Sequence, residues 1–353
     1  MKKEKQKAKR PAKRVLLTVI CCVLALILVA LIALTVWVKV FLSDIGRIDG
    51  SEPTLSPEEI SSMLDQTDAV DPNFTGPVLS DQDVTMPTGP AEIIENGENI
   101  INFLLVGQDR RPGDPRMHSD AMILVTINKS AKTLTMTSFM RDLWVQIPGY
   151  YKQRLNVPYF VDPTNGFNLL NETLAYNFGV SAERNIEVDF SGFTAAIEAV
   201  GGVEINLTAA EASHLNAQNS GWGLREGVNT LSGEAALAYS RIRKIGDDFA
   251  RTSRQRIVLM ALVDKAKTLS LTELYNLTKS ILPMLSTDMK DSEIIGYVME
   301  LAPLLPELTI VSQRIPADGA YYNAWINNCL VLCQDEDDWE TNLQILKDTL
   351  SDK

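Results

Sequence analysis

The chain has 353 residues, which is enough for one large domain with accessory segments or for two ordinary domains. Its hydrophobic fraction of 45% is typical of a globular protein and excludes a largely disordered chain. The net charge of −12 disfavours general binding to nucleic acid, and with only two histidines a His-rich zinc or copper site is unsupported.

The N-terminus predicts a membrane anchor. Residues 1–14 form a basic tail with eight Lys or Arg against one Glu, and the segment 15–38 then runs for 24 residues without a charge. At ~1.5 Å per residue, a helix of that length crosses the roughly 30 Å of bilayer hydrocarbon. A cleaved signal peptide is the alternative, but its apolar core is usually only ~7–15 residues long. The basic tail should stay in the cytoplasm, which places everything after Lys39 outside the cell.

The segment that follows the anchor predicts an acidic stalk. Without the first 14 residues the chain has 25 basic and 44 acidic residues, a net charge of −19. Residues 39–98 are rich in proline, and Arg47 is the only basic residue from Ser43 to Glu98. This segment has too little apolar surface to fold alone, apart from one short helix in SPEEISSMLDQ that Ser56 and Pro57 open. A spacer between membrane and body is its simplest role.

The folded body is predicted over residues 99–353, with its core over 99–265. Strands are expected in NIINFLLVGQD, AMILVTIN, KTLTMTSFM (a hairpin with the preceding strand), NIEVDF, VEINL, TIVSQRIP and CLVLC. Helices are expected in FNLLNETLAYNFG, SGFTAAIEAV, LSGEAALAYSRIR, TSRQRIVLMALVDKAKTL (with a Thr or Ser cap), LTELYNLTKSILPML, DSEIIGYVMELA and DWETNLQILKDTL. Strands and helices mingle without a strict βαβ rhythm, which indicates a single α/β domain with a mixed central sheet flanked by helices.

Two groups of apolar residues allow more than one interpretation. In the strand CLVLC, the Cα atoms of Cys329 and Cys333 would lie ~13 Å apart, too far for a disulfide, which needs less than about 7 Å. Two unpaired thiols are therefore favoured, although a helical segment would make a bridge conceivable. The second group is a helical seam that is favoured as a core face over a groove for a lipid chain: Ile257, Leu259, Met260 and Val263.

Two carboxylates next to a Gly/Pro loop suggest a metal site. In VGQDRRPGDPRMHSDAMI, Asp109 follows one predicted strand and Asp120 precedes the next. Side chains at the ends of neighbouring strands can converge on one cation, and Mg²⁺ prefers one or two carboxylates together with waters and phosphate oxygens. The alternative is that both acids cap turns. His118 beside Asp120 could act in the same site or be an ordinary loop histidine.

A concentrated cationic segment lies in YSRIRKIGDDFARTSRQR, where Asp247 and Asp248 oppose six basic residues: Arg241, Arg243, Lys244, Arg251, Arg254 and Arg256. Arg241 and Arg243 are predicted to end one helix, and Arg251 and Gln255 to share a face at the start of the next. Helix N-termini and arginine forks both favour phosphate, so a pyrophosphate is a natural occupant. A solvated cluster with internal ion pairs is the alternative.

In order and spacing, several segments resemble the LytR-CpsA-Psr family of bacterial envelope proteins: FLLVGQD…SDAMILVTIN, SFMRDLWVQIPG, RLNVPYF, VDFSGFTAAIEAVGGVEIN and LSGEAALAYSRIRK…DDFARTSRQR. The resemblance runs from about Asn99 to Leu262, and more loosely to the C-terminus. It implies a membrane-anchored, Mg²⁺-dependent phosphotransferase. Such an enzyme moves a glycopolymer, such as a wall teichoic acid or capsule precursor, from polyprenyl (undecaprenyl) pyrophosphate to a peptidoglycan hydroxyl.

The resemblance also implies roles for individual residues. Asp109 and Asp120 match the metal-site acids, Asp142 matches the acid of the family's Arg-Asp pair, and Asp142 and Asp248 are the two candidates for the general base. The positions that match the pyrophosphate ligands are Arg141, Arg241, Arg243, Arg251 and Gln255. Arg141 is also expected to take part in catalysis. The lipid tail needs an apolar channel, for which the helices after Thr252 are the expected walls.

One position departs from the family pattern. The family usually has an arginine two places before the second Asp, and this chain has His118 there. Arg116 could take over the phosphate contact, or the contact is lost and His118 stands in its place. The departure puts donor affinity in doubt rather than the class of reaction.

Two other functions remain open from the sequence. The same pyrophosphate site could use water as the acceptor, which would make the protein a hydrolase of polyprenyl-pyrophosphate glycans. Alternatively, the body could be a non-enzymatic module of the envelope that binds lipid or has a regulatory role. Direct DNA binding conflicts with the expected location outside the cell and with the acidic body.

Overall fold

The computed structural model describes residues 38–48, 56–64, 74–80, 83–84, 86, 89–108, 118–162, 164, 166–327 and 329–352. The chain divides into two units, Met1–Asp44 and Ile45–Lys353. In the first unit residues 38–42 are helical, and the rest of the predicted membrane segment lies outside the described residues. Within the described ranges, no helix has both the length and the apolar composition needed to cross a bilayer.

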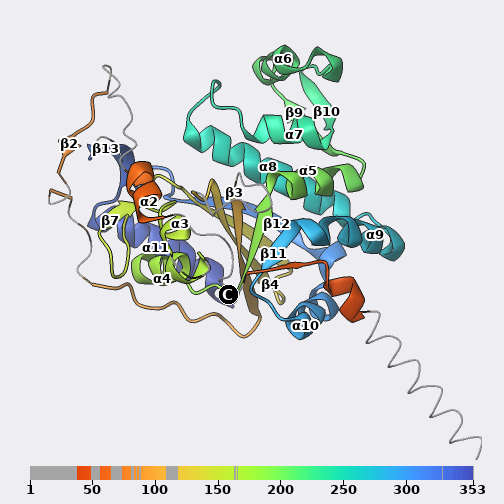
Figure 1. Ribbon diagram of the computed structural model, residues 1–353, viewed down its shortest axis with the longest axis horizontal. Coiled ribbons are helices and arrows are strands. Elements are labelled where there is room, and N and C mark those ends of the chain that lie inside the picture. Colours follow the sequence, from red (N-terminus) through yellow and green to blue (C-terminus); the bar gives the residue numbers. More distant parts are fainter. Residues whose placement is uncertain are drawn as a thin grey trace, which may run out of the picture. The chain divides into compact units, whose positions relative to one another are not determined.

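A mixed seven-stranded sheet forms the centre of the second unit, in the strand order β1-β11-β8-β3-β4-β5-β12 (Figure 1). Its strands are β1 (Gly46–Arg47), β3 (Ile100–Gln108), β4 (Ala121–Asn128), β5 (Thr133–Phe139), β8 (Arg184–Asp189), β11 (Leu285–Thr287) and β12 (Thr309–Ile315). β3, β4 and β5 form an antiparallel meander, whereas β8 and β12 add in parallel at its two sides. The predicted mixed sheet and its hairpin are confirmed.

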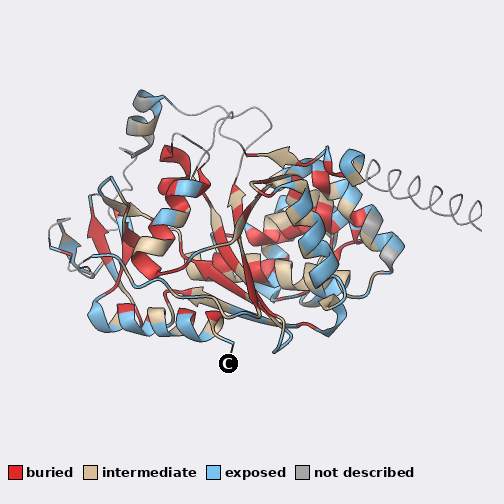
Figure 2. Ribbon diagram, turned by 90° about the horizontal axis from the view of Figure 1, so that it is seen from below, coloured by how far each residue is buried: buried red, intermediate tan, exposed pale blue. Residues whose placement is uncertain are grey.

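Helices cover both faces of this sheet. Successive side chains of each strand point to opposite faces, so the apolar residues of the strands pack against a layer of helices on each side. On one face, Leu104 and Val106 pack with α4 (Phe167–Phe178) and α11 (Glu336–Leu350). On the other face, Ile123 packs with α8 (Asp248–Ala266) and with the end of α10 (Asp291–Leu301). The strands between these layers are largely buried (Figure 2).

A second core lies beside the sheet in a lobe with its own elements: α5 (Phe190–Ala199), β9 (Val203–Leu207), α6 (Ala209–Gln218), η1 (Ser220–Trp222), β10 (Gly227–Leu231), α7 (Gly233–Ser240) and α9 (Leu271–Ile281). Strands β9 and β10 form an antiparallel pair, and their inward residues bury against these helices. Helix α8 contributes Val258 to this core, so it packs on both the sheet and the lobe. Figure 1 shows α8 running between the two.

The remaining elements are short: α2 (Pro57–Leu64), β2 (Val78–Leu79), β6 (Trp144–Gln146), β7 (Lys152–Arg154), α3 (Pro158–Val161), η2 (Leu282–Met284), η3 (Leu305–Glu307), β13 (Tyr322–Ile326) and β14 (Cys329–Cys333). β13 and β14 pair with each other. β14 also contacts the segment that follows β5, where Leu332 N–H donates to the Asp142 carbonyl at 2.9 Å. Cys329 and Cys333 are buried in this strand and form no disulfide, as predicted.

Several boundaries and one burial state differ from the prediction. The helix predicted in LTELYNLTKSILPML is shorter, because α9 ends at Ile281 and Leu285 belongs to β11. α7 ends at Ser240 with Arg241 as its C-cap, so Arg243 follows the helix and does not end it. α8 begins at Asp248 rather than after a Thr or Ser cap, because the Asp247 side chain accepts a hydrogen bond from Ala250 N–H at 2.9 Å. In the predicted core seam, Leu259, Met260 and Val263 pack on the sheet as expected. Ile257 is 39% exposed, so its assignment to the core is wrong.

Several described parts of the predicted stalk lie against the body. The expected short helix is present as α2, and Ser56 Oγ accepts a hydrogen bond from Glu59 N–H at 3.3 Å. β1 extends the main sheet, and β2 pairs with β13. Ile94 N–H donates to the Gly179 carbonyl at 2.8 Å. These contacts tie stretches of an otherwise apolar-poor segment to the folded body.

Candidate active site

A cavity of about 320 Å³ lies where the start of β4 meets the end of α7 and the start of α8. We call it the arginine cavity, and its lining residues are Asp120, Phe190, Ser240, Arg241, Arg243, Arg251 and Gln255. Three guanidinium groups thus face one carboxylate. Five of the residues singled out from the sequence come together here, while Phe190 and Ser240 were not predicted.

The loop between α7 and α8 is held in place by Arg254, a member of the same cationic segment. Its Nε lies 2.7 Å from Glu211 Oε1, and its Nη1 and Nη2 donate to the carbonyls of Ile242 and Ile245 at 3.2 and 2.7 Å. Arg254 is buried and does not line the cavity. The loop that presents Arg243 is therefore positioned by a neighbouring arginine with a structural role.

Unsatisfied polar atoms make the arginine cavity a good place for an anion. Arg251 is only 3% exposed, and its Nε and the Oε1 of Gln255 are buried without hydrogen-bond partners. Burial, and then the charge of Arg141, lower the pKa of Arg251. Buried polar groups in folded proteins are normally satisfied, and arginine pairs with phosphate oxygens in two parallel hydrogen bonds. An anionic ligand would accept a hydrogen bond from Arg251 Nε–H and offset the crowded positive charge, whereas Gln255 Oε1 is an acceptor and needs a donor.

Arg141 stands at the edge of this cavity and contacts three carboxylates. Its nitrogens lie 3.1 Å from Asp120 Oδ1, 3.5 Å from Asp142 Oδ2 and 3.4 Å from Asp248 Oδ1. Burial opposes its charge, but Asp142, Asp248 and Asp120 outweigh that effect and raise the pKa of Arg141. Arg141 therefore remains a cation that fixes the relative positions of three acids.

The acid Asp142 has a second partner that the sequence did not reveal. Arg154 Nη1 lies 3.5 Å from Asp142 Oδ1, because β7 pairs with β6 and places Arg154 opposite Trp144. Burial raises the pKa of the Asp142 carboxyl, although Arg141 and Arg154 act in the other direction. Asp248, in contrast, is held by Arg251 at 2.8 Å. Of the two candidate bases, Asp142 is the one whose environment favours accepting a proton.

A second cavity of about 320 Å³ adjoins the arginine cavity. We call it the carboxylate cavity, and its lining residues are Met140, Arg141, Asp142, Arg154, Asp247, Asp248, Phe249, Asn323, Leu330, Val331 and Leu332. Two ion pairs join the walls of the two cavities: Arg141 with Asp120, and Arg251 with Asp248. The cavities are therefore neighbours across a thin layer of paired charges.

An apolar slot of about 90 Å³ adjoins the arginine cavity. The slot shares four lining residues with that cavity: Asp120, Phe190, Ser240 and Gln255. Its further lining residues are Leu105, Gly107, Ala121, Ile123, Val188, Asp189, Phe193, Leu237 and Leu259. The expectation that helices after Thr252 would wall an apolar channel holds for Leu259 of α8. Most of the wall comes from β3, β4, β8, α5 and α7, which the sequence did not indicate.

Comparison with known proteins places the chain in a family. The LytR_cpsA_psr family model matches residues 65–348. The chain belongs to the LytR-CpsA-Psr family. A relative from Oceanobacillus iheyensis, named polyisoprenyl-teichoic acid–peptidoglycan teichoic acid transferase TagU, is 34% identical over 215 residues, or 59% of this chain and 64% of the relative. The TagT transferase of Bacillus subtilis is 32% identical over 180 residues, or 49% of this chain and 55% of the relative. The matches thus span between half and two thirds of these relatives' lengths.

Solved structures of the LytR-CpsA-Psr family share this fold. TagT, described with bound octaprenyl pyrophosphate lipid, superposes with a TM-score of 0.56 over 76% of this chain and 98% of that chain, at 23% identity. Another structure, described as B. subtilis TagT, gives a TM-score of 0.59 at 24% identity over the same share of both chains. This likeness confirms the mixed α/β domain with flanking helices.

His118, the position that departs from the LytR-CpsA-Psr pattern, lies outside the arginine cavity. Its ring packs on Phe160 with the centroids 4.1 Å apart. Burial, followed by the charge of Arg154, lowers the pKa of His118 to about 4, so the imidazole is neutral at pH 7. It cannot supply the positive charge of the arginine that it replaces. Arg116, the possible substitute, lies outside the described residues.

The described part of the predicted metal site consists of Asp120. Its side chain is 32% exposed at the cavity, and Oδ1 accepts a hydrogen bond from Arg141 at 3.1 Å. The second predicted ligand, Asp109, lies outside the described residues. Among the described residues, no three His, Cys, Asp or Glu side chains cluster as a metal site. A carboxylate in a cavity lined by three arginines still fits Mg²⁺ if phosphate binds there, because Mg²⁺ takes few protein ligands and completes its shell with phosphate oxygens and waters.

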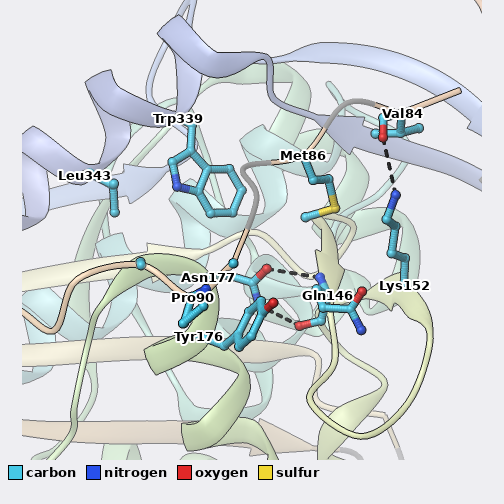
Figure 3. Close-up of a pocket in the computed structure, with 11 residues that line it drawn as sticks. Val84, Met86, Pro90, Gln146, Lys152, Tyr176, Asn177, Trp339 and Leu343 are labelled. Atoms are coloured by element: carbon cyan, nitrogen blue, oxygen red, sulfur yellow. Dashed lines mark hydrogen bonds between the residues drawn. The ribbon is translucent and has the colours of Figure 1, made fainter. Parts of the chain in front are cut away.

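A cavity of about 420 Å³ lies elsewhere and lacks converging charges (Figure 3). Among the described residues that line it, Lys152 is the only charged side chain, and its Nζ donates to the Val84 carbonyl at 3.3 Å. The side-chain amide of Asn177 accepts a hydrogen bond from Gln146 N–H at 3.0 Å and donates one to the Gln146 carbonyl at 2.7 Å. The polar groups of this cavity therefore have structural roles, and Lys152 ties the chain at Val84 to the body.

Proposed function

We propose that the protein is a Mg²⁺-dependent phosphotransferase. It moves a glycopolymer from a polyprenyl pyrophosphate to a peptidoglycan hydroxyl and forms a phosphodiester link. The observation that carries this proposal is the arginine cavity opening into the apolar slot, which matches a pyrophosphate with an attached hydrocarbon chain. The transferase names of TagU and TagT, and the octaprenyl pyrophosphate in a TagT structure, support the same donor class.

The arginine cavity would bind the two phosphates, with Arg241, Arg243 and Arg251 neutralising their charge and Gln255 donating its amide. The first isoprene units of the lipid would enter the slot between Phe193 and Leu259. Fixing the pyrophosphate in this way positions the sugar-proximal phosphorus for in-line attack, which supplies much of the catalysis in phosphoryl transfer.

The acceptor hydroxyl attacks the sugar-proximal phosphorus, and its proton passes to the Asp142 carboxylate. The bond from that phosphorus to the bridging oxygen breaks, and polyprenyl phosphate leaves with the electron pair. Arg251 and Arg243 stabilise the charge that develops on the bridging oxygen. Asp120, together with Asp109, would hold Mg²⁺, whose chemistry is to withdraw charge from the phosphate oxygens.

The proposed topology follows from the N-terminal segment. Residues 1–14 would be cytoplasmic, 15–38 would span the membrane, 39–98 would form the acidic segment that leads to the body, and 99–353 would be the catalytic domain outside the cell. Reaction on peptidoglycan requires this side of the membrane. Labelling of an engineered exposed cysteine (Ser292→Cys) by a membrane-impermeant reagent on intact cells tests it, and labelling only after lysis would contradict it.

Product analysis tests the activity. The full-length chain in detergent is incubated with Mg²⁺, a radiolabelled polyprenyl-pyrophosphate-linked saccharide and uncrosslinked peptidoglycan glycan strands. We expect label on the glycan through a phosphodiester and release of polyprenyl phosphate. Release of free saccharide phosphate alone would identify a hydrolase instead. Donor binding without turnover, with or without Mg²⁺, would identify a binding module.

A variant that lacks two of the positive charges of the arginine cavity provides the control for this experiment. Arg241 and Arg243 are exposed, so the double variant Arg241→Gln, Arg243→Gln should fold normally. We expect it to lose donor cleavage. A double variant with full turnover would remove the basis of the proposal.

A further inference from the structure

The carboxylate cavity is built differently from the arginine cavity. Three carboxylates, Asp142, Asp247 and Asp248, line it with the two guanidinium groups of Arg141 and Arg154. Free phosphate would meet an excess of negative charge here. A neutral ligand that donates hydrogen bonds fits better, because each carboxylate accepts several of them.

The other walls of this cavity provide both amide and apolar groups. Asn323 of β13 is exposed at the cavity, and Leu330 of β14 is 42% exposed. Phe249 forms part of the wall, and its ring is fixed by the Arg314 guanidinium 4.1 Å from its centroid. The Nε atoms of Arg141 and Arg154 are buried without hydrogen-bond partners. Carboxylates, an amide and apolar surfaces together suit a saccharide, which carries many hydroxyls on an apolar ring.

The position of this cavity agrees with the direction of the reaction. In-line transfer needs the attacking oxygen and the leaving oxygen on opposite sides of the phosphorus. The leaving polyprenyl phosphate would occupy the arginine cavity and the slot. The carboxylate cavity meets the arginine cavity at the two ion pairs Arg141–Asp120 and Arg251–Asp248, and it contains Asp142. Its volume of about 320 Å³ lies within the ~300–1,000 Å³ of small-ligand sites.

We infer that the carboxylate cavity is the acceptor subsite, which binds a sugar unit of the peptidoglycan glycan with one hydroxyl directed at the donor phosphorus. This inference rests on the proposed function for its place in the reaction, but the binding of a glycan can be measured without turnover. Asn323 and Leu330 are positioning residues for the acceptor and contact neither the donor nor the arginine cavity.

The pair β13–β14 carries the residues to be changed, and the exposed pair β9–β10 provides control positions. Leu330→Trp fills the mouth of the carboxylate cavity, and Asn323→Leu removes the amide at nearly constant size. In the β9–β10 pair, Val228 and Asn206 lie opposite each other, and both are exposed. Val228→Trp and Asn206→Leu therefore make a comparable change on exposed strand residues that line neither cavity.

The first measurement is equilibrium dialysis of full-length protein against radiolabelled, uncrosslinked peptidoglycan tetrasaccharide, without donor. We expect Leu330→Trp to weaken binding at least about tenfold, and Asn323→Leu about three- to tenfold, the effect of losing a hydrogen bond. Val228→Trp and Asn206→Leu should stay within about twofold of the wild type. Equal binding by all four variants, or no binding by the wild type, would overturn the inference whatever the activity.

The second measurement separates acceptor from donor. We expect Asn323→Leu and Leu330→Trp to raise the KM for the glycan, while the dissociation constant for the polyprenyl-pyrophosphate saccharide stays within about twofold of the wild type. A parallel loss of donor binding would show that the cavity serves the donor and would overturn the inference. If the wild type binds the tetrasaccharide in this cavity but transfers nothing, the proposed function fails and the glycan site stands.

Discussion

The two neighbouring cavities use the same residue types in opposite proportions. The arginine cavity has three guanidinium groups and one carboxylate, whereas the carboxylate cavity has three carboxylates and two guanidinium groups. Their volumes are about equal. This difference in charge balance is the basis for our proposal that the arginine cavity binds the anionic donor and the carboxylate cavity a neutral polyol. Four substitutions, two of them in or at the arginine cavity, can break or sharpen this division.

The largest effect is expected for Asp142→Asn in the carboxylate cavity. Loss of a general base lowers kcat by about 10²–10⁴-fold, while donor binding should not change. Burial raises the pKa of Asp142, and the carboxylate must be ionised to accept a proton. The wild-type rate should therefore fall with decreasing pH at a pKa above the ordinary aspartate value, and the variant should lack this step. Asp264→Asn on an exposed part of α8 is the control. A variant that keeps the step would move the base to another residue.

In the arginine cavity, Arg243→Ala should lower kcat/KM by about 10²–10³-fold, the usual cost of removing one donor to developing charge. Its side chain is exposed, so the thermal unfolding temperature should not change. Lys244→Ala removes an adjacent cation that does not line the cavity, and it should retain near wild-type activity. If both variants behave alike, the cationic segment is only a solvated surface.

Asp120→Asn tests whether the single carboxylate of the arginine cavity holds a metal ion. We expect the Mg²⁺ concentration for half-maximal activity to rise at least about tenfold, since lost metal contacts cost roughly 10–100-fold in affinity. Asp248→Asn removes another partner of Arg141 but no proposed metal ligand, so its Mg²⁺ requirement should match the wild type. Electron paramagnetic resonance with Mn²⁺ provides a direct binding measurement, and unchanged Mn²⁺ binding in Asp120→Asn would contradict the assignment.

The smallest effect is expected for His118→Gln. The pKa of about 4 makes this imidazole neutral at pH 7, and it lies outside the lining of both cavities. The KM for the donor should change by less than about twofold, because no positive charge is lost. A tenfold increase would show that His118 contacts the donor in spite of its position against Phe160.

Local sequence patterns indicated the basic residues of the arginine cavity, but they indicated neither its Phe190 and Ser240 nor the arrangement of the carboxylate cavity. Arg241, Arg243, Arg251 and Gln255 lie close together in the chain, so helix geometry alone brings them near one another. Arg154 approaches Asp142 through the hairpin of β6 with β7, whose Pro148-Gly149 turn is visible in the sequence although the prediction did not use it. The contact of β14 with Leu143 instead joins positions far apart in the chain, which the tertiary fold sets and local preference does not.

Some missed elements did have a signal. Helix α6 was not predicted, yet Thr208 and Glu211 form a capping box at its start, and this spacing is visible in the sequence. β13 is five residues long and follows a turn, so its weak alternation resembles loop sequence. Asn323 lies on β13, so the shortness of this strand also hid part of the carboxylate cavity, whereas β14 with Leu330 was predicted from the sequence.

Arg141 joins the two cavities through its three carboxylate partners, and this has a thermodynamic consequence. A donor phosphate that draws Arg141 away from Asp120 changes its hold on Asp142 and Asp248, which face the other cavity. Occupancy of one cavity must then alter affinity in the other, and linkage makes that influence reciprocal. A glycan that strengthens donor binding by some factor is itself bound more tightly by the same factor, and a glycan that weakens it is released by the donor to the same extent.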